Sequence, residues 1–132
     1  MGTRSLTIVY DDEYQPIMNM YAQWDGYPSG HGAELAKFLN SFEAITNGIR
    51  VGEDRKTANG MGCLAAQLVA HFKVGVGEFY LYPVSEKDCG QEYEYHIYKD
   101  RVTVFGYDNE HLFTGPWSQF LEFCTTPAEA QQ

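Results

Sequence analysis

The stretch Trp24-Asp25-Gly26-Tyr27-Pro28-Ser29-Gly30-His31-Gly32 joins two segments whose apolar residues repeat with different periods. Before it, from residue 17 to residue 24, apolar and polar residues alternate, which is typical of a half-buried strand. After it, apolar residues recur every three or four positions as far as Phe42, which is typical of an amphipathic helix. The stretch is therefore predicted to be a loop between the end of a strand and the start of a helix.

Two interpretations of this loop remain open. Free backbone amides at the start of a helix attract anions, and glycine lets the backbone approach a ligand closely. Glycine and proline are also typical of any tight turn. On the first interpretation the loop binds an anionic metabolite or a nucleotide, and the candidate ligand-binding residues are Arg4, Asp25, Tyr27, Ser29 and His31.

An N-terminal β-hairpin is predicted to bring Arg4 beside Asp25. Alternating residues form two strands, residues 6–10 and 17–24, and the polar residues 11–14 form the loop between them. Counting back from this loop in antiparallel register places Arg4 opposite Asp25 or the residue two positions before it. We expect an ion pair there that fixes the loop over residues 26–32; the alternative is that Arg4 points into water.

The order of the predicted elements is typical of an α+β domain. The expected elements are the hairpin, helices over residues 29–42 and 59–72, a short strand at 49–51, strands at 78–83, 92–98, 101–105 and 111–113, and a helix after Thr114, with Ser29, Asn59 and Thr114 as helix caps. We expect one domain over residues 1–132 with a frayed tail at 125–132. Its antiparallel sheet combines the hairpin with a C-terminal meander and is covered on one face by about three helices. A partly closed barrel is the second alternative.

The acidic side chains are concentrated in the C-terminal part of the chain. The net charge of the 132 residues is −9; residues 76–132 carry 10 acidic and 3 basic side chains, against 8 and 6 in residues 1–75. Such a charge repels phosphate backbones, so direct binding of nucleic acid is not expected. An acidic surface can dock on a basic protein partner, and it can also serve solubility alone.

The strand predicted over residues 92–98 has two different faces. Tyr93, Tyr95 and Ile97 share the face expected to meet the helices. The opposite face, expected to meet solvent, supplies the candidate partner-binding residues Glu92, Glu94, His96 and Tyr98. The alternative is that these aromatic residues only form cross-strand pairs that stabilise the sheet.

The sequence does not contain a recognisable catalytic, metal or cofactor motif. The three cysteines are widely spaced, which argues against a disulfide framework, and the four histidines lack metal-binding spacing. Asp25, Ser29 and His31 are too close in sequence to form a catalytic triad. We therefore expect no metal, no cofactor and no enzymatic activity. Because no apolar run is long enough for a membrane span or a secretory signal, we expect a cytoplasmic protein that does not bind membranes.

Two short motifs carry a resemblance. The opening Met1-Gly2-Thr3-Arg4-Ser5, followed by a β-strand pattern, and the later Trp24-Asp25-Gly26-Tyr27-Pro28 resemble a family of small uncharacterised proteins of phages and bacteria. The resemblance covers about the first 40 residues. It implies a viral or mobile-element origin and carries no established function.

These observations favour a non-enzymatic interaction protein, of phage accessory type, that binds a macromolecular partner through an acidic sheet surface. The alternative is a small-molecule binding domain or a modest enzyme with its site in the loop over residues 24–32. The sequence predicts neither the partner nor the oligomeric state.

Overall fold

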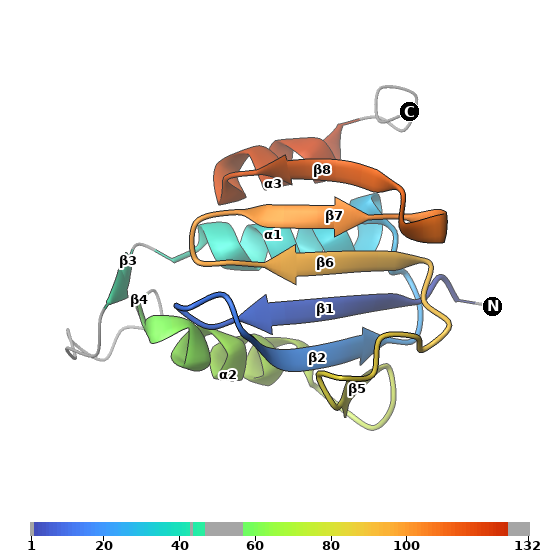
Figure 1. The fold of residues 1–132 in the computed structure, drawn as a ribbon, viewed down its shortest axis with the longest axis horizontal. Coiled ribbons are helices and arrows are strands. Elements are labelled where there is room, and N and C mark those ends of the chain that lie inside the picture. The colour runs from blue at the N-terminus through green and yellow to red at the C-terminus, as the bar shows by residue number, and fades with distance from the viewer. Residues whose placement is uncertain (1, 43, 47–56, 127–132) are drawn as a thin grey trace.

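The computed structural model describes residues 2–42, 44–46 and 57–126, and its main feature is a six-stranded sheet with helices on one side (Figure 1). In chain order the elements are β1 Ser5–Tyr10, β2 Pro16–Ala22, a π-helical turn Pro28–Gly32, α1 Ala33–Asn40, β3 Ala44–Thr46, β4 Thr57–Asn59, α2 Gly60–Phe72, β5 Phe79–Tyr82, β6 Tyr93–Ile97, β7 Val102–Phe105, a 3₁₀ turn Tyr107–Asn109, β8 His111–Gly115 and α3 Trp117–Thr125. Strands β3 and β4 form a separate parallel pair.

The strand order β5-β2-β1-β6-β7-β8 confirms the α+β class and the open sheet. The hairpin β1–β2 is antiparallel, as predicted. The meander predicted from residues 78–83, 92–98 and 101–105 is correct only for its last two strands, β6 and β7, which β8 extends. The prediction was wrong for β5, which pairs with β2 at the far edge of the sheet, because β1 occupies the place beside β6. The two parts meet where β1 pairs with β6 in parallel, with Ser5 beside Tyr93 and Val9 beside Ile97. The sheet is therefore antiparallel except at this junction, and β5 and β8 are its edges.

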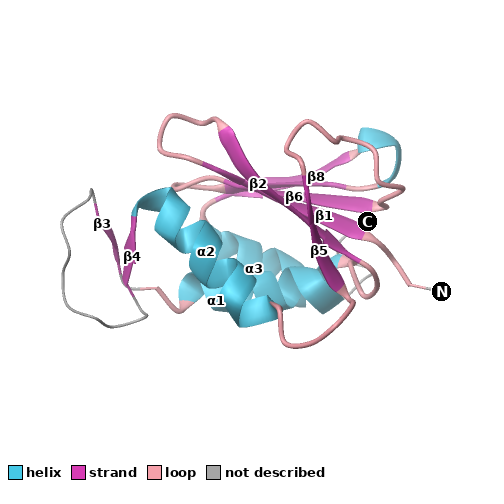
Figure 2. Ribbon diagram, turned by 90° about the horizontal axis from the view of Figure 1, so that it is seen from below, coloured by secondary structure: helices cyan, strands magenta, loops and turns pink. Residues whose placement is uncertain are grey.

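Figure 2 shows α1, α2 and α3 on the same side of the six-stranded sheet. The hydrophobic core lies between these two layers and contains Val9, Tyr95 and Ile97 from the central strands, all fully buried. Because side chains alternate along a strand, their sequence neighbours point away from the helices. The predicted division of residues 92–98 into a helix-facing and an outward face is confirmed. None of the helices described is both long and apolar enough to cross a membrane.

The start of the first helix differs from the prediction. In place of a regular helix from residue 29, the chain forms the tight turn Pro28–Gly32, in which Gly30 has the non-helical angles φ −101° and ψ −105°. Regular α-helix begins only at Ala33. Ser29 makes no capping hydrogen bond, because the residue that precedes the turn is Tyr27 and the turn's amides bond to backbone carbonyls.

The other predicted caps are also wrong in detail. Asn59 does precede α2, but its side chain makes no capping hydrogen bond. Thr114 belongs to strand β8, and Pro116 is the residue that precedes α3, because proline favours the first positions of a helix and does not extend a strand. The strand predicted at 49–51 and most of the predicted frayed tail, residues 127–132, lie outside the described residues.

Candidate functional site

The loop over residues 24–32 is anchored to the sheet through its own backbone. The Gly26 amide donates to the Thr3 carbonyl (2.8 Å), and the Gly26 carbonyl accepts from the Tyr95 hydroxyl (2.6 Å). A Cβ at Gly26 would lie 2.7 Å from the Ser5 Cβ, closer than two carbon atoms can approach. Glycine at this position is therefore explained by close packing against β1.

The amides expected to receive an anion are already in use. The amides of Gly30 and Gly32 donate to the Tyr27 carbonyl, and that of His31 donates to the Asp25 carbonyl (2.7 Å). The second interpretation of the loop, a tight turn, accounts for these contacts. An anion site built on free helix-start amides is not supported at this position.

His31 lies inside the protein and not on the loop surface. Its side chain is 5% exposed, and its Nε2 shares a hydrogen bond with Thr7 Oγ1 (3.2 Å). The ring contacts Phe72 and Phe79, with centroid distances of 5.0 and 5.3 Å. Burial lowers the pKa of His31 to about 4, so the imidazole is neutral near pH 7.

Arg4 pairs with a residue that the hairpin register did not predict. Its guanidinium lies 2.9 Å from Glu92 Oε1, and its backbone amide also donates to the Glu92 carboxylate. The predicted ion pair with Asp25 is wrong, because the parallel strand β6 brings Glu92 alongside Arg4, whereas the chain turns at Asp25, which has a φ of 58°. Burial opposes ionisation of Glu92, but the hydrogen bonds from Arg4 outweigh it and lower its pKa.

Four of the five loop candidates line one pocket. Asp25, Tyr27, Ser29 and His31 border a cavity of about 510 Å³ between the loop, the start of α1, the end of α2 and the start of β5. Arg4 does not line it. The structure thus brings the loop candidates together but separates Arg4 from them.

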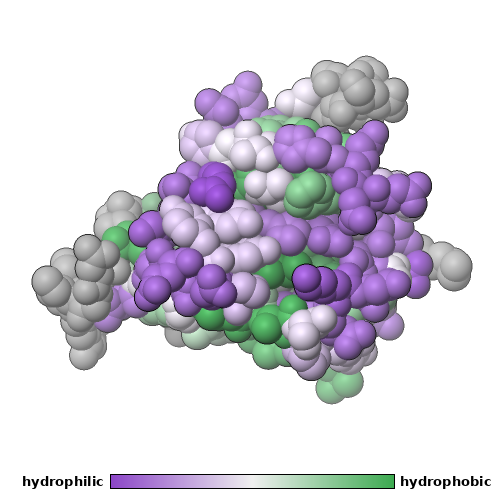
Figure 3. Space-filling model, viewed as in Figure 1, coloured by the Kyte–Doolittle hydropathy of each residue, from purple (hydrophilic) through white to green (hydrophobic). Residues whose placement is uncertain are grey.

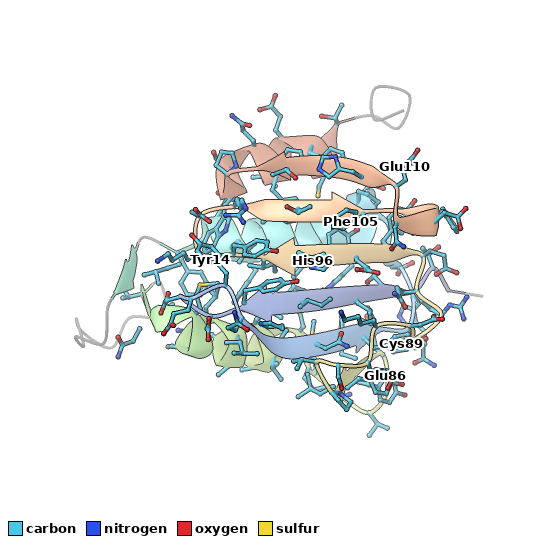
Figure 4. The ribbon with its side chains drawn as sticks, viewed as in Figure 1. Tyr14, Glu86, Cys89, His96, Phe105 and Glu110 are labelled. Carbon is cyan, nitrogen blue, oxygen red and sulfur yellow. The ribbon has the colours of Figure 1, made fainter. Side chains whose placement is uncertain are left out.

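The outer face of the sheet is the side opposite the helices, and it faces the viewer in Figures 3 and 4. Its side chains come from alternate positions of the central strands, including Ile8, Tyr10, Glu94, His96 and Phe105. Figure 3 shows mainly hydrophilic residues here around a smaller apolar area over β1 and β2. None of the three α-helices covers this face (Figure 2). The partner-binding candidates therefore lie on the open side of the sheet.

Three side chains on this face form a hydrogen-bonded chain. Glu94 Oε1 bonds to His96 Nε2 (2.8 Å), and His96 Nδ1 bonds to the Tyr10 hydroxyl (2.6 Å). The hydrogen bond from His96, assisted by one from Gln91, lowers the pKa of Glu94 despite partial burial. Burial raises the pKa of Tyr10, so its hydroxyl stays protonated. The chain fixes His96 and keeps Glu94 ionised.

An aromatic cluster of Tyr10, Tyr14, His96, Tyr98 and Phe105 surrounds this chain. Tyr10 stacks on Tyr98 with a centroid distance of 4.2 Å, and Phe105 contacts His96 edge to face at 5.3 Å. The hairpin loop brings Tyr14 to within 5.8 Å of Tyr98, and Figure 4 shows Tyr14 and Phe105 near His96. The Arg101 guanidinium lies over the rings of Tyr98 and Tyr14, 4.2 and 5.3 Å from their centroids, so the cluster already holds one cation of the chain itself.

An acidic pocket of about 340 Å³ adjoins this cluster. Four carboxylates line it, from Asp88, Glu92, Glu94 and Asp108, together with the single cation Lys87. Glu94 belongs both to the pocket and to the hydrogen-bonded chain. Because Arg4 balances Glu92, the net negative charge of the pocket beside the aromatic cluster comes from Asp88, Glu94 and Asp108.

Sequence reasoning missed several residues of these sites. Tyr10, Tyr14, Phe105, Asp88 and Asp108 belong to the outer face or its pocket; the first two come from the distant N-terminal hairpin, and the other three from segments on either side of residues 92–98. The alternation of residues 6–10 could have placed Tyr10 on the same face as Leu6, but it does not reveal which face the helices cover. No local signal connects Tyr10 to His96, because they are 86 positions apart.

The described histidine, cysteine and acidic side chains do not assemble a group of three that could hold a metal ion. Asp25, Ser29 and His31 share the loop pocket, but His31 Nε2 bonds to Thr7, and no hydrogen bond joins Ser29 to His31 within the described residues. Comparison with protein-family models, with curated proteins and with solved structures finds no match.

Proposed function

We propose that this protein is a non-enzymatic interaction protein that binds a basic segment of a protein partner on the outer face of its sheet. A partner Arg or Lys side chain enters the acidic pocket, and adjoining apolar or planar groups of the same segment pack on the aromatic cluster.

The observation that carries this proposal is the acidic pocket beside the aromatic cluster on a face that the three α-helices leave open. Aromatic and arginine side chains dominate binding energy at protein interfaces, and complementary charge directs association. Glu94 stands at the boundary of the two areas, with its carboxylate oriented by His96 and Gln91. A basic side chain in the pocket therefore meets the oriented carboxylate of Glu94 beside the rings of His96 and Phe105.

The alternative of an anionic small molecule in the loop has less support. The amides of Gly30, His31 and Gly32 are engaged, and Arg4 belongs to a different region of the surface. A phage accessory role stays part of the proposal and rests only on the resemblance of residues 1–5 and 24–28.

A random-peptide display selection against the full-length protein tests the proposal. We expect the enriched peptides to contain Arg or Lys next to an aromatic residue. Their affinity should fall about ten-fold for Glu94→Gln, which removes the charge but keeps the hydrogen-bond acceptor. The affinity should also fall as salt rises, because the attraction is electrostatic.

The matched control is Glu122→Gln, which removes the same charge from an exposed position of α3. It should leave peptide affinity unchanged. Equal binding by the two variants, enrichment of acidic or neutral peptides, or no enrichment at all would contradict the proposal.

A further inference from the structure

The loop pocket is a second hollow, separate from the outer face. It measures about 510 Å³, within the range of small-molecule sites. The residues on which the argument depends are Trp24, Asp25, Tyr27, His31, Phe72 and Glu78. None of them lines the acidic pocket or belongs to the aromatic cluster. Whatever binds here is independent of the proposed partner site.

The charge of this pocket is negative. Asp25 and Glu78 form no ion pair with any described residue, and the Asp25 carboxylate accepts only a long hydrogen bond, from the Tyr27 hydroxyl (3.5 Å). Lys37, the one lysine of the pocket lining, already lies 3.5 Å from Glu34. Lys73 on the adjoining segment donates to the carbonyls of Gly77 and Phe79. Lys73 stays positively charged beside the backbone that flanks Glu78, but the pocket lining itself carries three carboxylates, Asp25, Glu34 and Glu78, against one lysine, so its net charge is negative.

The walls of the pocket are aromatic. Trp24 and Tyr27 are 43% and 39% exposed although both are large aromatic residues, and Phe72 faces the pocket from the end of α2. Exposed aromatic faces beside carboxylates bind organic cations through their ring electrons, an interaction that strengthens when water is displaced. The exposed ring faces of Trp24 and Tyr27 are therefore available to a cation in the pocket.

A largely buried polar side chain completes the site. His31 lines the pocket at 5% exposure, and its Nε2 is held by Thr7, while Nδ1 makes no hydrogen bond within the described residues. When Nε2 carries the proton and donates to Thr7 Oγ1, Nδ1 is an acceptor for an N–H group of a ligand. The imidazole stays neutral near pH 7 because its pKa is about 4, so it does not repel a cation.

We infer that the loop pocket binds an organic ammonium group. Asp25 and Glu78 balance its charge, and Trp24 and Tyr27 enclose it. His31 accepts a hydrogen bond from one of its N–H groups. This ligand is a cation, whereas one interpretation of the glycine-rich sequence was an anionic metabolite or nucleotide. The ammonium can belong to a free amine or to a lysine side chain of a peptide.

Titration of the ¹⁵N-labelled protein with tyramine, followed by NMR, tests this inference. The chain has two tryptophans, and Trp117 lies outside the pocket with its indole N–H bonded to the carbonyl of Tyr98 in the aromatic cluster, so the two indole signals distinguish binding in the loop pocket from binding on the outer face. We expect tyramine to shift the Trp24 signal saturably and to leave Trp117 unchanged. Tyrosol, which has a hydroxyl in place of the ammonium, should bind at least about ten-fold more weakly.

Variants that replace a carboxylate with an amide of the same shape identify which carboxylates balance the charge of the ammonium. Asp25→Asn and Glu78→Gln should each weaken tyramine binding about two- to five-fold, the range for partly exposed ion pairs, and the double variant about ten-fold. Glu110→Gln, at an exposed position outside the pocket, is the matched control and should have no effect. Titration with acetyl-lysine-methylamide, whose side-chain amine is free, distinguishes the sources: tighter binding than tyramine identifies a peptide lysine, and weaker binding a free amine.

Equal binding of tyrosol and tyramine, or displacement of tyramine by AMP or inorganic phosphate, would overturn the inference. So would the absence of saturable amine binding below about 10 mM, the weakest affinity that a specific site of this size should have. Failure of the peptide selection at Glu94 would leave these results unaffected, because the two sites share no residue.

Discussion

The loop over residues 24–32 and the outer face of the sheet are both rich in polar and aromatic residues, but different forces hold them. In the loop, buried backbone groups carry the structure: Gly26 bonds to both Thr3 and Tyr95, and His31 is enclosed by aromatic rings. On the outer face, side chains bond to side chains at partly exposed positions, as Tyr10 does to His96. Changes in the loop should therefore cost stability, whereas changes on the face should mainly alter binding.

The comparison also distinguishes two kinds of residue within the loop over residues 24–32: glycines that the packing requires and side chains that project outward. The glycines of the loop are required because neighbouring atoms leave no space for a side chain, as at Gly32, where a Cβ would lie 2.9 Å from the Tyr95 hydroxyl. The side chains of Trp24 and Asp25 are exposed in large part, and their polar groups and ring faces are open to a ligand. A function of the loop must therefore be sought in those side chains and not in its glycines.

The largest expected effect is that of Gly26→Ala. The new methyl group would collide with Ser5 and with the Thr3 carbonyl, which approach the Cβ position to 2.7 and 2.9 Å. We expect a loss of about 3 kcal/mol in the free energy of unfolding, the upper end of the range for overpacking. Chemical denaturation measures this loss.

Gly62→Ala in α2 is the matched control. Nothing lies within 4 Å of the Cβ position of Gly62, so this variant should stabilise the protein by about 0.5–1 kcal/mol. Similar losses in both variants would contradict the packing argument.

Acidification should destabilise the loop through His31. Its pKa is about 4 in the folded protein and about 6.5 when unfolded, so the unfolded chain binds more protons between these values. Stability is then complete above pH 6.5 and falls as the pH is lowered toward 4, with a loss of about 2 kcal/mol between pH 7 and pH 5. Denaturation at several pH values measures this slope. His31→Phe cannot titrate and should flatten it; an unchanged slope would show that His31 is not its source.

Tyr95→Phe tests the anchor of the loop without adding atoms. The variant removes the hydroxyl that donates to the Gly26 carbonyl and leaves that buried acceptor without this partner. We expect a loss of about 1–2 kcal/mol, typical of an unsatisfied buried group. Stability equal to that of the wild-type protein would mean that solvent or a shift of the loop replaces this hydrogen bond.

Much of the fold follows from local patterns in the sequence. The periodicity of residues 59–72 predicted α2 to within one residue, and alternation predicted β6 and its two faces. The hairpin was predicted correctly as an antiparallel pair. These features depend on neighbours a few positions apart, which a single sequence displays directly.

Pairings between distant segments could not be predicted in the same way. The parallel contact of β1 with β6 brings together residues almost 90 positions apart, and it determines that Arg4 pairs with Glu92 and not with Asp25. The burial of His31 depends on Phe72 and Phe79 from two other elements. The contacts of Arg4 and His31 therefore depend on the tertiary fold and could not be read from neighbouring positions in the sequence.

The smallest expected effect on stability is that of Tyr10→Phe on the outer face. The variant removes the hydrogen bond to His96 but keeps the ring that stacks on Tyr98 at 4.2 Å, and the position is partly open to water. Because water can replace the lost partner of His96, we expect a loss below about 1 kcal/mol, measured by denaturation beside Tyr95→Phe. The binding of selected basic peptides should weaken by more than this small change in stability implies, since His96 then orients Glu94 less firmly. A stability loss equal to that of Tyr95→Phe would remove the distinction between the two regions, because it would show that the outer face is held as rigidly as the buried anchor of the loop.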